Sequence, residues 1–365
     1  MKYSQKLLFT PGPLSTTMSV KEAMLVDLGT RDIEYQNVTK SVREKLLKIA
    51  LASKEEFSVV LLQGSGTYAV ESVLNSFVSA NDKLLIFANG AYGDRMAQIA
   101  TMSGLNFEKK DYSMIRSLDL AEVEKAVSES DATIVSFVHD ETTAGVLNDI
   151  KGICDICRKY NKKIICDAMS SFGGIEINLD EVKPDFLVTS SNKCIQGVPG
   201  FGIIYGRREA FEACKGNSKS LALDLYDQWK YMEDTDGGFR FTSPTHVLLA
   251  FDQALDELEA EGGIPARAKR YRENQKLIAE KMTELGFELL VDPNEQAPMI
   301  TTLLVPEGLD FADMYEKLKA KGFLLYSGKL PKYNAFRIGN IGDLHAQDFI
   351  DLAQAVKEYL EEAKK

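Results

Sequence analysis

Short apolar runs alternate with amphipathic stretches through the N-terminal half of the chain. The runs are Val59–Leu62, Leu84–Phe87, Thr133–Val138, Ile164–Cys166 and Phe186–Val188. Such alternation predicts an α/β fold in which a mostly parallel sheet is covered by helices on both faces. Phe201–Tyr205 follows the last run without space for a crossover helix, so we predict that it is an antiparallel neighbour in the same sheet.

Further elements are predicted on either side of this region. Ser19–Ala52 carries apolar residues at helical spacing with an interruption at Gly29–Asp32, which predicts two helices. Residues 216–245 are polar, and a long helical pattern then runs from His246 to about Met282. Strand candidates and an amphipathic C-terminal helix follow, at Thr301–Val305, Phe323–Tyr326, Ala335–Ile338 and the helix face with Phe349, Leu352, Val356 and Leu360. We therefore predict an N-terminal arm (1–20), a large domain (21–248) and a smaller C-terminal α/β domain (249–365).

The charge balance and the cysteines narrow the class of protein. Lys and Arg number 43 against 54 Asp and Glu, a net charge of −11, which argues against nucleic acid as a partner. No stretch approaches the roughly 18 apolar residues that cross a bilayer, so no membrane partner is expected. The apolar run Leu7–Phe9 is too short for a signal peptide, and five cysteines, an odd number, fit reduced thiols. We expect a cytoplasmic protein.

A glycine-rich turn follows the first strand of the predicted sheet. Gly64–Ala69 opens a helix, so its backbone N–H groups and hydroxyls are placed to hold a phosphate. A dinucleotide-binding fold has the same glycine spacing but requires an acidic side chain at the end of the next strand. This chain has Asn89–Gly90 at that position. A plain tight turn is the other alternative. We favour a different phosphate group over both.

An acid and a lysine follow two neighbouring strands. Asp167 ends one apolar run and Lys193 comes just after the next, at the sheet edge where ligands bind in open α/β sheets. Such a lysine can form an imine with an aldehyde cofactor, and such an aspartate can hold the protonated ring nitrogen of pyridoxal phosphate. A solvated lysine and an aspartate that caps a loop are the alternatives for each residue taken singly. Tyr92 and the hydroxyls of His139–Thr143 follow two further strands and are expected at the same edge.

Other candidate groups point to an anionic substrate and argue against a metal. Arg337 lies between Phe336 and Ile338 on a strand, so its guanidinium points away from their apolar side and can bind a carboxylate or phosphonate in two-pronged fashion. A surface salt bridge is the alternative for Arg337. The Cys154-x-x-Cys157 spacing lies in a helical stretch and is interpreted as core packing. Three scattered histidines do not make a His-rich metal site, so no metal is expected.

Taken together, these residues resemble the class V, fold-type I aminotransferases, and within them the 2-aminoethylphosphonate–pyruvate transaminases. The similarity runs over nearly the whole chain. The motifs that carry it are Leu8–Leu14, Thr30–Asp32, Gln63–Thr67, Asn89–Gly93, Asp167–Gly174, Asn192–Gly202, Phe239–His246 and Phe336–Gly342. The resemblance implies a mostly parallel seven-stranded sheet covered by helices, with a smaller C-terminal domain.

The resemblance also implies a role for each matching residue. Lys193 would be the Schiff-base lysine and Asp167 the partner of the ring nitrogen of pyridoxal 5′-phosphate. Ser65, Gly66 and Thr67 would form part of the phosphate cup, Tyr92 would stack on the ring, Thr142 would bond the ring hydroxyl and Arg337 would bind the substrate's anionic group. Thr242 or Ser243 would reach the phosphate of the neighbouring subunit, because family members are homodimers with sites at the interface. At Asp140 and Ala144 the chain departs from the family pattern, which has a different residue and a hydroxyl there.

The implied activity is transfer of the amino group of 2-aminoethylphosphonate to pyruvate, which gives phosphonoacetaldehyde and L-alanine. A pyridoxal phosphate ammonia-lyase that acts on a hydroxylated aminoethylphosphonate is one alternative on the same scaffold. A transaminase that uses glyoxylate or serine is another, which the context Lys193–Gly197 disfavours. From a different class, a binding or regulatory protein that kept the fold is disfavoured by the intact Lys193, Asp167 and Arg337.

Overall fold

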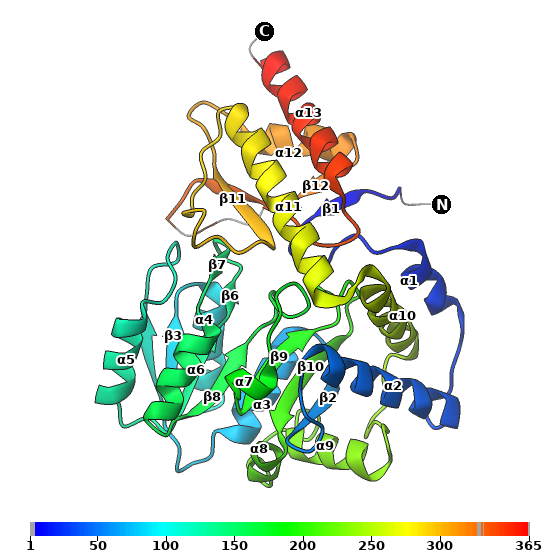
Figure 1. The fold of residues 1–365 in the computed structure, drawn as a ribbon, viewed down its shortest axis with the longest axis vertical. Helices are drawn as coiled ribbons and strands as arrows, with labels where there is room; N and C mark the ends of the chain where they lie inside the picture. The colour runs from blue at the N-terminus through cyan, green and yellow to red at the C-terminus, as the bar shows by residue number, and fades with distance from the viewer. Residues whose placement is uncertain (1–3, 327–329, 331, 364–365) are drawn as a thin grey trace.

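The computed structural model describes residues 4–326, 330 and 332–363. Figure 1 shows a larger lower body built around one sheet and a smaller upper body that contains the C-terminal helix. The long helix α11 (Gly263–Glu284) rises from the lower body into the upper one. Within the described part of the chain, no helix is long and apolar enough to cross a membrane.

The lower body is organised by a seven-stranded sheet of order β2-β10-β9-β8-β5-β3-β4. Its strands are β2 (Phe57–Gln63), β3 (Leu84–Ala88), β4 (Phe107–Asp111), β5 (Ile134–Val138), β8 (Lys163–Asp167), β9 (Phe186–Ser190) and β10 (Phe201–Arg207). Only β10 runs antiparallel, and it pairs with both β9 and β2. The predictions of a mostly parallel sheet and of an antiparallel Phe201–Tyr205 are therefore confirmed.

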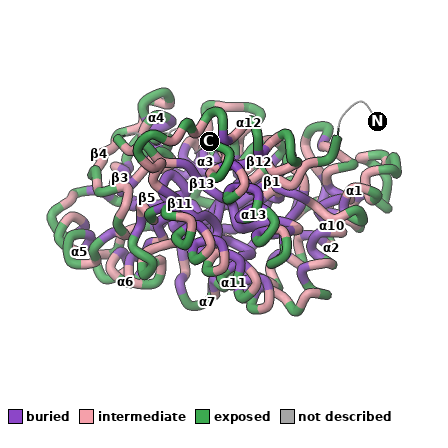
Figure 2. The backbone as a smooth tube through the Cα atoms, turned by 90° about the horizontal axis from the view of Figure 1, so that it is seen from above, coloured by how far each residue is buried: buried purple, intermediate pink, exposed green. Residues whose placement is uncertain are grey.

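Helices cover both faces of this sheet (Figure 1). They are α1 (Met18–Glu22), η1 (Ala23–Leu25), α2 (Ile33–Ile49), α3 (Gly66–Phe77), α4 (Ala91–Met102), α5 (Leu120–Glu129), α6 (Ile150–Lys159), α7 (Leu179–Val182), α8 (Arg208–Ala213), α9 (Leu225–Asp234) and α10 (Thr245–Glu261). Six of the seven strands are buried almost throughout, whereas the edge strand β4 is half-buried to exposed. In Figure 2 the buried residues run through the middle of the molecule and the exposed ones form its rim.

The upper body combines the C-terminal segment with the start of the chain. Its elements are β11 (Ile300–Leu304), α12 (Phe311–Ala320), β12 (Phe323–Leu325), β13 (Ala335–Gly339) and α13 (Ala346–Ala363). β11 pairs antiparallel with β13, whereas β1 (Leu7–Phe9) pairs parallel with β12. Phe9 is fully buried in the core beside Phe349. The predicted arm thus contains a strand of the upper body, and its residues 1–3 lie outside the described residues.

Three local predictions need correction or addition. The polar segment 216–245 contains helix α9, whose buried face includes Leu225 and Trp229. The helical pattern from His246 to Met282 is two helices, because the backbone turns at Gly262, which has a φ of +108°. The edge strand β4 was not predicted, since its sequence Phe-Glu-Lys-Lys-Asp lacks an apolar run. The predicted boundary at 248/249 falls within α10, and the division into domains stays a prediction.

Candidate active site

Five chain segments follow the carboxyl ends of parallel strands at one edge of the large sheet. The turn after β2 carries Ser65, the turn after β3 carries Tyr92, β8 ends at Asp167 and the turn after β9 carries Lys193. The segment after β5 forms a small hairpin of β6 (Asp140–Glu141) and β7 (Val146–Leu147). Ligands of open α/β sheets bind at this edge, so the strand ends define the candidate site.

The centre of the site is a narrow cavity of about 30 Å³, which we call the slot. Its lining comes from α3, α4 and the end of β8, and consists of Gly66, Thr67, Val70, Tyr92, Arg95, Met96, Asp167 and Met169. Ser65 is the N-cap residue of α3, but its hydroxyl makes no capping hydrogen bond to the helix. The first turn of α3 therefore presents N–H groups and two hydroxyls, those of Ser65 and Thr67, toward an anion.

Asp167 is the acid of the slot. Its side chain is 5% exposed, and its carboxylate accepts a hydrogen bond from the N–H of Met169 at 2.9 Å. Burial raises the pKa of Asp167 to about 6, although that N–H and the charges of Lys193 and Arg95 act in the opposite direction. A carboxylate with a pKa raised by burial gains from a cationic partner, such as a protonated ring nitrogen.

Lys193 is buried and is held by the start of the chain. Its Nζ donates to the carbonyl oxygen of Pro11 at 2.6 Å. Gly12 has a φ of +107°, and a Cβ there would lie 2.8 Å from Cδ of Lys193 and 2.7 Å from the carbonyl oxygen of Asn192. Burial lowers the pKa of Lys193, which favours the neutral amine. A neutral amine is the form that attacks an aldehyde.

Glu141 fixes the loop that carries Tyr92. Its carboxylate accepts hydrogen bonds from the N–H groups of Tyr92 (3.2 Å) and Gly93 (3.3 Å) at the start of α4. It also accepts from the N–H and the hydroxyl of Thr143, and it is fully buried. Burial of the phenol raises the pKa of Tyr92 to about 12, so this ring is neutral. Arg95 covers the ring at 4.9 Å from its centroid.

Arg337 and Thr142 meet on the other side of the site. Nη1 of Arg337 donates to the carbonyl oxygens of Thr142 and Thr143, both at 3.1 Å. Its guanidinium carbon lies 4.2 Å from the ring centroid of Tyr326, and the residue is 6% exposed. The hydroxyl of Thr142 donates to Ser170 at 2.7 Å. The guanidinium is thus a buried cation from the upper body, oriented by two carbonyl oxygens and the Tyr326 ring.

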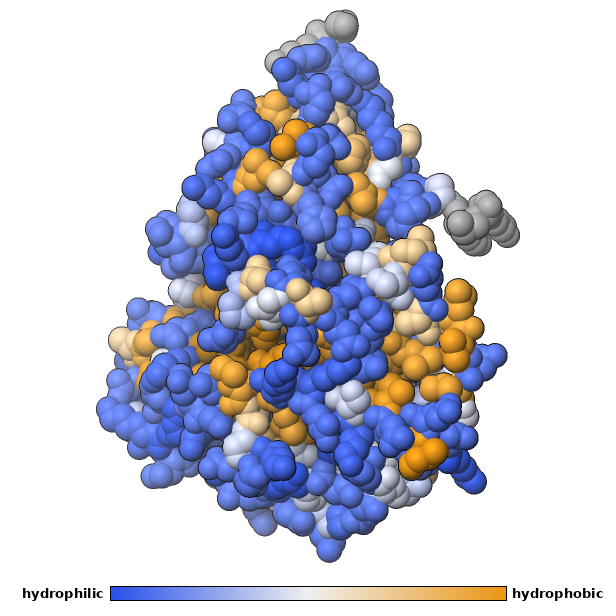
Figure 3. Space-filling view, turned by 45° about the vertical axis from the view of Figure 1, so that its right-hand side comes forward, coloured by the Kyte–Doolittle hydropathy of each residue, from blue (hydrophilic) through white to orange (hydrophobic). Residues whose placement is uncertain are grey.

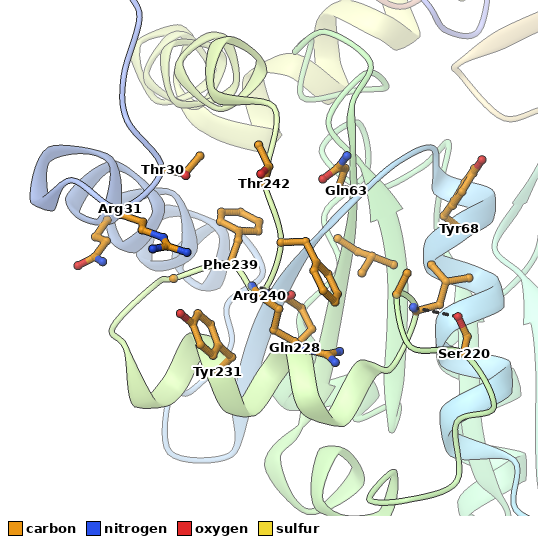
Figure 4. Close-up of a pocket in the computed structure, with 16 residues that line it drawn as sticks. Thr30, Arg31, Gln63, Tyr68, Ser220, Gln228, Tyr231, Phe239, Arg240 and Thr242 are labelled. Carbon is orange, nitrogen blue, oxygen red and sulfur yellow. Dashed lines mark hydrogen bonds between the residues drawn. The ribbon is translucent and has the colours of Figure 1, made fainter.

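Thr242 and Ser243 do not line the slot. Thr242 lines a larger cavity of about 900 Å³, which we call the outer cavity, together with Thr30, Arg31 and Gln63 (Figure 4). Ser243 is buried and its hydroxyl lies 2.5 Å from that of Tyr35. The structure therefore separates these two residues from the other predicted phosphate ligands of the same chain.

Apolar side chains are exposed near the outer cavity. Three of them flank Thr30 and Arg31, two residues that line this cavity, along the chain: Leu25 is 81% exposed, Ile33 64% and Val26 54%. Phe241, which lines the cavity, is 48% exposed. Figure 3 shows apolar patches on the lower, larger part of the molecule.

The residues of the slot fit pyridoxal 5′-phosphate. A Cβ at Gly66 would overlap the side chain of Met169, so the absence of a side chain at Gly66 lets the first turn of α3 pack closely against Met169. Tyr92 and Met169 both line the slot and supply faces for a flat ring, with Asp167 available to a ring nitrogen. The α3 turn supplies donors for a phosphate. The slot thus offers groups of the kind that the phosphate and the ring nitrogen of this cofactor require.

The other candidates from the sequence have structural explanations. β3 ends at Asn89, which is buried and bonds with Asn148 at 3.1 Å, so the acidic partner of a dinucleotide site is replaced by an amide pair. Cys154 and Cys157 are buried in the core on α6, and burial raises the pKa of both thiols. In the described part of the chain, no group of three or more His, Cys, Asp or Glu side chains is arranged to hold a metal ion.

Sequence reasoning missed four residues of the site: Pro11, Arg95, Glu141 and Met169. Arg95 was within reach, because Tyr92, Arg95 and Met96 have the i, i+3, i+4 spacing of one helix face. Met169 follows Asp167 by two residues and so leaves the same strand end. No local pattern marks Pro11 or Glu141, whose contacts join segments far apart in the chain.

The chain is similar to known aminotransferases. The family model Aminotransferase class-V matches residues 23–336. The chain is 49% identical over 358 residues to the 2-aminoethylphosphonate–pyruvate transaminase of Bacillus cereus, a match that covers 98% of each chain.

Solved structures show the same fold. Alanine–glyoxylate aminotransferase from Nostoc sp. matches with a TM-score of 0.92 at 22% identity, over 99% of this chain and 96% of that one. Pyridoxamine–pyruvate aminotransferase from Mesorhizobium loti matches with a TM-score of 0.91 at 23% identity, over 100% and 94%. The predicted fold class, that of the fold-type I aminotransferases, is confirmed.

Proposed function

The chain belongs to the class-V aminotransferase family, and from this premise we propose that it transfers the amino group of 2-aminoethylphosphonate to pyruvate. The products are phosphonoacetaldehyde and L-alanine, and pyridoxal 5′-phosphate is the cofactor. The proposal is carried by the identity of 49% to a relative of that name, together with Asp167 and Lys193 at neighbouring strand ends and Arg337 bonded to the carbonyl oxygens of Thr142 and Thr143 beside them.

Six residues in and around the slot receive a proposed role in holding the cofactor. Ser65, Gly66 and Thr67 bind its phosphate through the first turn of α3. Tyr92 stacks on one face of the ring, with its backbone fixed by Glu141. Asp167 pairs with the ring nitrogen. The hydroxyl of Thr142, which lies beside Ser170, contacts the ring hydroxyl of the cofactor.

Lys193 carries the proton in both half-reactions. When bound, pyridoxal 5′-phosphate supplies the aldehyde that receives the amine and a ring that accepts the electron pair of the broken C–H bond. The amine of Lys193 takes the proton from the substrate carbon and delivers it at the cofactor. With pyruvate the same amine moves the proton the other way. A pKa lowered by burial equips Lys193 to act as both base and acid.

Arg337 binds the anionic end of each substrate, the phosphonate in one half-reaction and the carboxylate in the other. Two backbone carbonyls and the Tyr326 ring hold its guanidinium in one plane. A planar fork of N–H donors binds both kinds of anion in a two-pronged manner.

Arg337→Lys is expected to reduce kcat/KM about 10- to 100-fold for 2-aminoethylphosphonate and for pyruvate alike. A lysine keeps the charge but cannot bond two carbonyls and an anion in the same geometry. Stopped-flow measurement of each half-reaction separately checks this. Lys281→Arg, on the exposed side of α11, is the control and should leave both half-reactions unchanged. Normal kinetics in Arg337→Lys would remove Arg337 from the substrate site.

We also propose a homodimer in which Thr242 or Ser243 reaches the phosphate of the neighbouring chain. The exposed apolar side chains around the outer cavity support an interface at this surface. The position of Thr242 outside its own chain's slot supports a contact made to another chain. Sedimentation of the purified protein, with a single species of twice the chain mass, is the expected result.

We propose the cytoplasm as the compartment of the reaction. The five cysteines Cys154, Cys157, Cys166, Cys194 and Cys214 are free and buried. Unpaired thiols in a chain of this size suit a reducing compartment.

A coupled assay tests the proposed function. The purified protein is supplied with pyridoxal 5′-phosphate and 2-aminoethylphosphonate, with and without pyruvate, while alanine and ammonia are followed separately. Alanine that forms only with pyruvate supports the transaminase. Ammonia released from a hydroxylated aminoethylphosphonate without pyruvate would instead identify the lyase. Turnover with only glyoxylate or serine would identify another class-V transaminase and overturn the substrate assignment.

A further inference from the structure

Arg95 lines the slot, yet the proposed function gives it no role. It lies on α4, one helical turn after Tyr92, so the two side chains leave the same face of the helix. Its guanidinium carbon is 4.9 Å from the centroid of the Tyr92 ring, and the residue is exposed. A cation therefore lies beside the ring that is proposed to stack on the cofactor.

Arg95 is also joined to the first turn of α3. Its Nη1 donates to the hydroxyl oxygen of Thr67 at 3.3 Å. Thr67 is one of the residues proposed to bind the phosphate of the cofactor. Because its oxygen accepts from Arg95, the hydroxyl of Thr67 keeps its own proton for another acceptor. Arg95 and Thr67 thus offer donors side by side, from two different helices.

The charges of the slot are divided between two residues. Among the described residues of its lining, Arg95 is the cation and Asp167 the acid. Pyridoxal 5′-phosphate likewise has an anionic phosphate and a ring nitrogen that becomes positively charged on protonation. Asp167 is proposed to pair with that nitrogen, which leaves the phosphate as the group that matches Arg95. The charge of Arg95 also reaches Asp167, whose pKa it lowers against the effect of burial.

Lys193 and Arg337, the other cations proposed to act at the site, bond elsewhere. Lys193 donates to a backbone carbonyl of the N-terminal segment, and Arg337 donates to two backbone carbonyl oxygens between β6 and β7. Arg95 forms no ion pair with a described carboxylate, and the adjacent acid, Asp94, pairs with Lys109 at 2.8 Å instead. An arginine without an acidic partner is available to an anionic ligand.

We propose that Arg95 is a further cofactor-binding residue, which binds the phosphate of pyridoxal 5′-phosphate together with Thr67. The inference rests on the cofactor of the proposed function and adds to it a cationic ligand for the phosphate. A guanidinium has five N–H donors, so one can stay on Thr67 while others bind phosphate oxygens in a two-pronged manner. The same guanidinium lies against the Tyr92 ring, which ties the position of the ring to that of the phosphate.

Equilibrium dialysis of the cofactor-free full-length chain tests this role without any substrate. Arg95→Gln should weaken the binding of pyridoxal 5′-phosphate about tenfold, the lower end of the range for a charge-assisted hydrogen bond, because Arg95 is exposed. The affinity of this variant for pyridoxal, which lacks the phosphate, should be unchanged. Arg95→Lys keeps the charge and should recover part of the loss. Circular dichroism verifies that each variant is folded.

Lys109→Gln is the matched control. It removes a positive charge that pairs with the residue next to Arg95, and Lys109 is not part of the described lining of the slot. Its affinity for pyridoxal 5′-phosphate should equal that of the wild type. Inorganic phosphate is a second probe, which should compete with pyridoxal 5′-phosphate for the wild-type chain and compete more weakly for Arg95→Gln.

Three results would overturn the inference. Equal losses of affinity for pyridoxal 5′-phosphate and pyridoxal would show that Arg95 acts through the Tyr92 ring, and unchanged affinities for both would show that it does not contact the cofactor. Unchanged cofactor affinity with a raised KM for 2-aminoethylphosphonate would assign Arg95 to the phosphonate of the substrate. A wild-type chain that binds no pyridoxal 5′-phosphate would overturn the proposed cofactor as well, whereas a wrong substrate assignment leaves all of these affinities untouched.

Discussion

Lys193→Ala is expected to lower turnover by about 10⁴-fold or more while leaving the fold intact. The variant removes the amine that moves the proton in both half-reactions, and the described lining of the slot contains no lysine that could replace it. The chain should remain folded, because loss of a buried amine that burial already drives toward the neutral form removes little stabilisation. Single-turnover kinetics of each half-reaction, together with circular dichroism, check both parts.

Lys193→Arg is the matched variant for this experiment. It keeps a positive charge near Pro11 but cannot give up a proton at the pH of the assay, so it should be as inactive as the alanine variant. Turnover within tenfold of the wild type in either variant would contradict the role proposed for Lys193. A loss confined to Lys193→Ala, with Lys193→Arg active, would reduce the role to one of charge.

Asp167→Asn is expected to lower turnover by roughly 10²- to 10⁴-fold and to weaken cofactor binding. Breaking a buried, hydrogen-bonded charge pair by removal of one partner costs about 3–5 kcal/mol, which corresponds to that range of rate. The amide keeps the shape of the side chain, and its oxygen still accepts from the N–H of Met169. Turnover at saturating cofactor, and cofactor affinity by equilibrium dialysis, measure the two effects.

The same substitution should raise the stability of the cofactor-free chain, although it lowers turnover. Burial raises the pKa of Asp167 to about 6, above the usual value near 4. Stability from such a group is fully present below its usual pKa and is lost as the pH rises through the folded value. Asp167→Asn should therefore stabilise the cofactor-free chain above pH 6, as measured by thermal unfolding at several pH values.

Asp185→Asn is the control that separates the loss of a charge at the site from the loss of a partly buried charge elsewhere in the sheet. Asp185 is a partly buried aspartate whose pKa is also raised by burial, and it accepts from the N–H of Ile164 at the opposite end of the sheet. Its substitution should alter stability and leave cofactor affinity unchanged. Equal losses of affinity in both variants would show that Asp167 acts through the fold and not through the ring nitrogen.

Much of the site's framework follows from local sequence. Asp167 and Lys193 follow apolar runs, and parallel strands bring their carboxyl ends to one edge, so their proximity was predictable from hydrophobic pattern. The same reasoning placed the Gly66 turn at the start of a helix. Arg337 was correctly given an orientation away from its apolar strand neighbours, Phe336 and Ile338, which are fully buried in the core.

Other features depend on contacts between distant segments and have no local signature. The carbonyl of Pro11 bonds Lys193 across 182 positions of the chain, and β1 joins the upper body by pairing with β12. The carbonyls that orient Arg337 lie 195 and 194 positions away. A backbone carbonyl is present at every residue, so a sequence cannot mark which one a side chain will reach.

Local patterns in the sequence were enough to predict the α/β architecture, the strand ends that carry Asp167 and Lys193, and the glycine-rich turn before α3, because periodicity and glycine spacing specify them locally. Three features became visible only in the folded chain: the burial of Asp140, the hydrogen bond from the N–H of Tyr92 to Glu141, and the position of Thr242 outside its own chain's slot. The physical reason is that desolvation and hydrogen-bond partners are properties of the packed neighbourhood, which segments from both bodies build together.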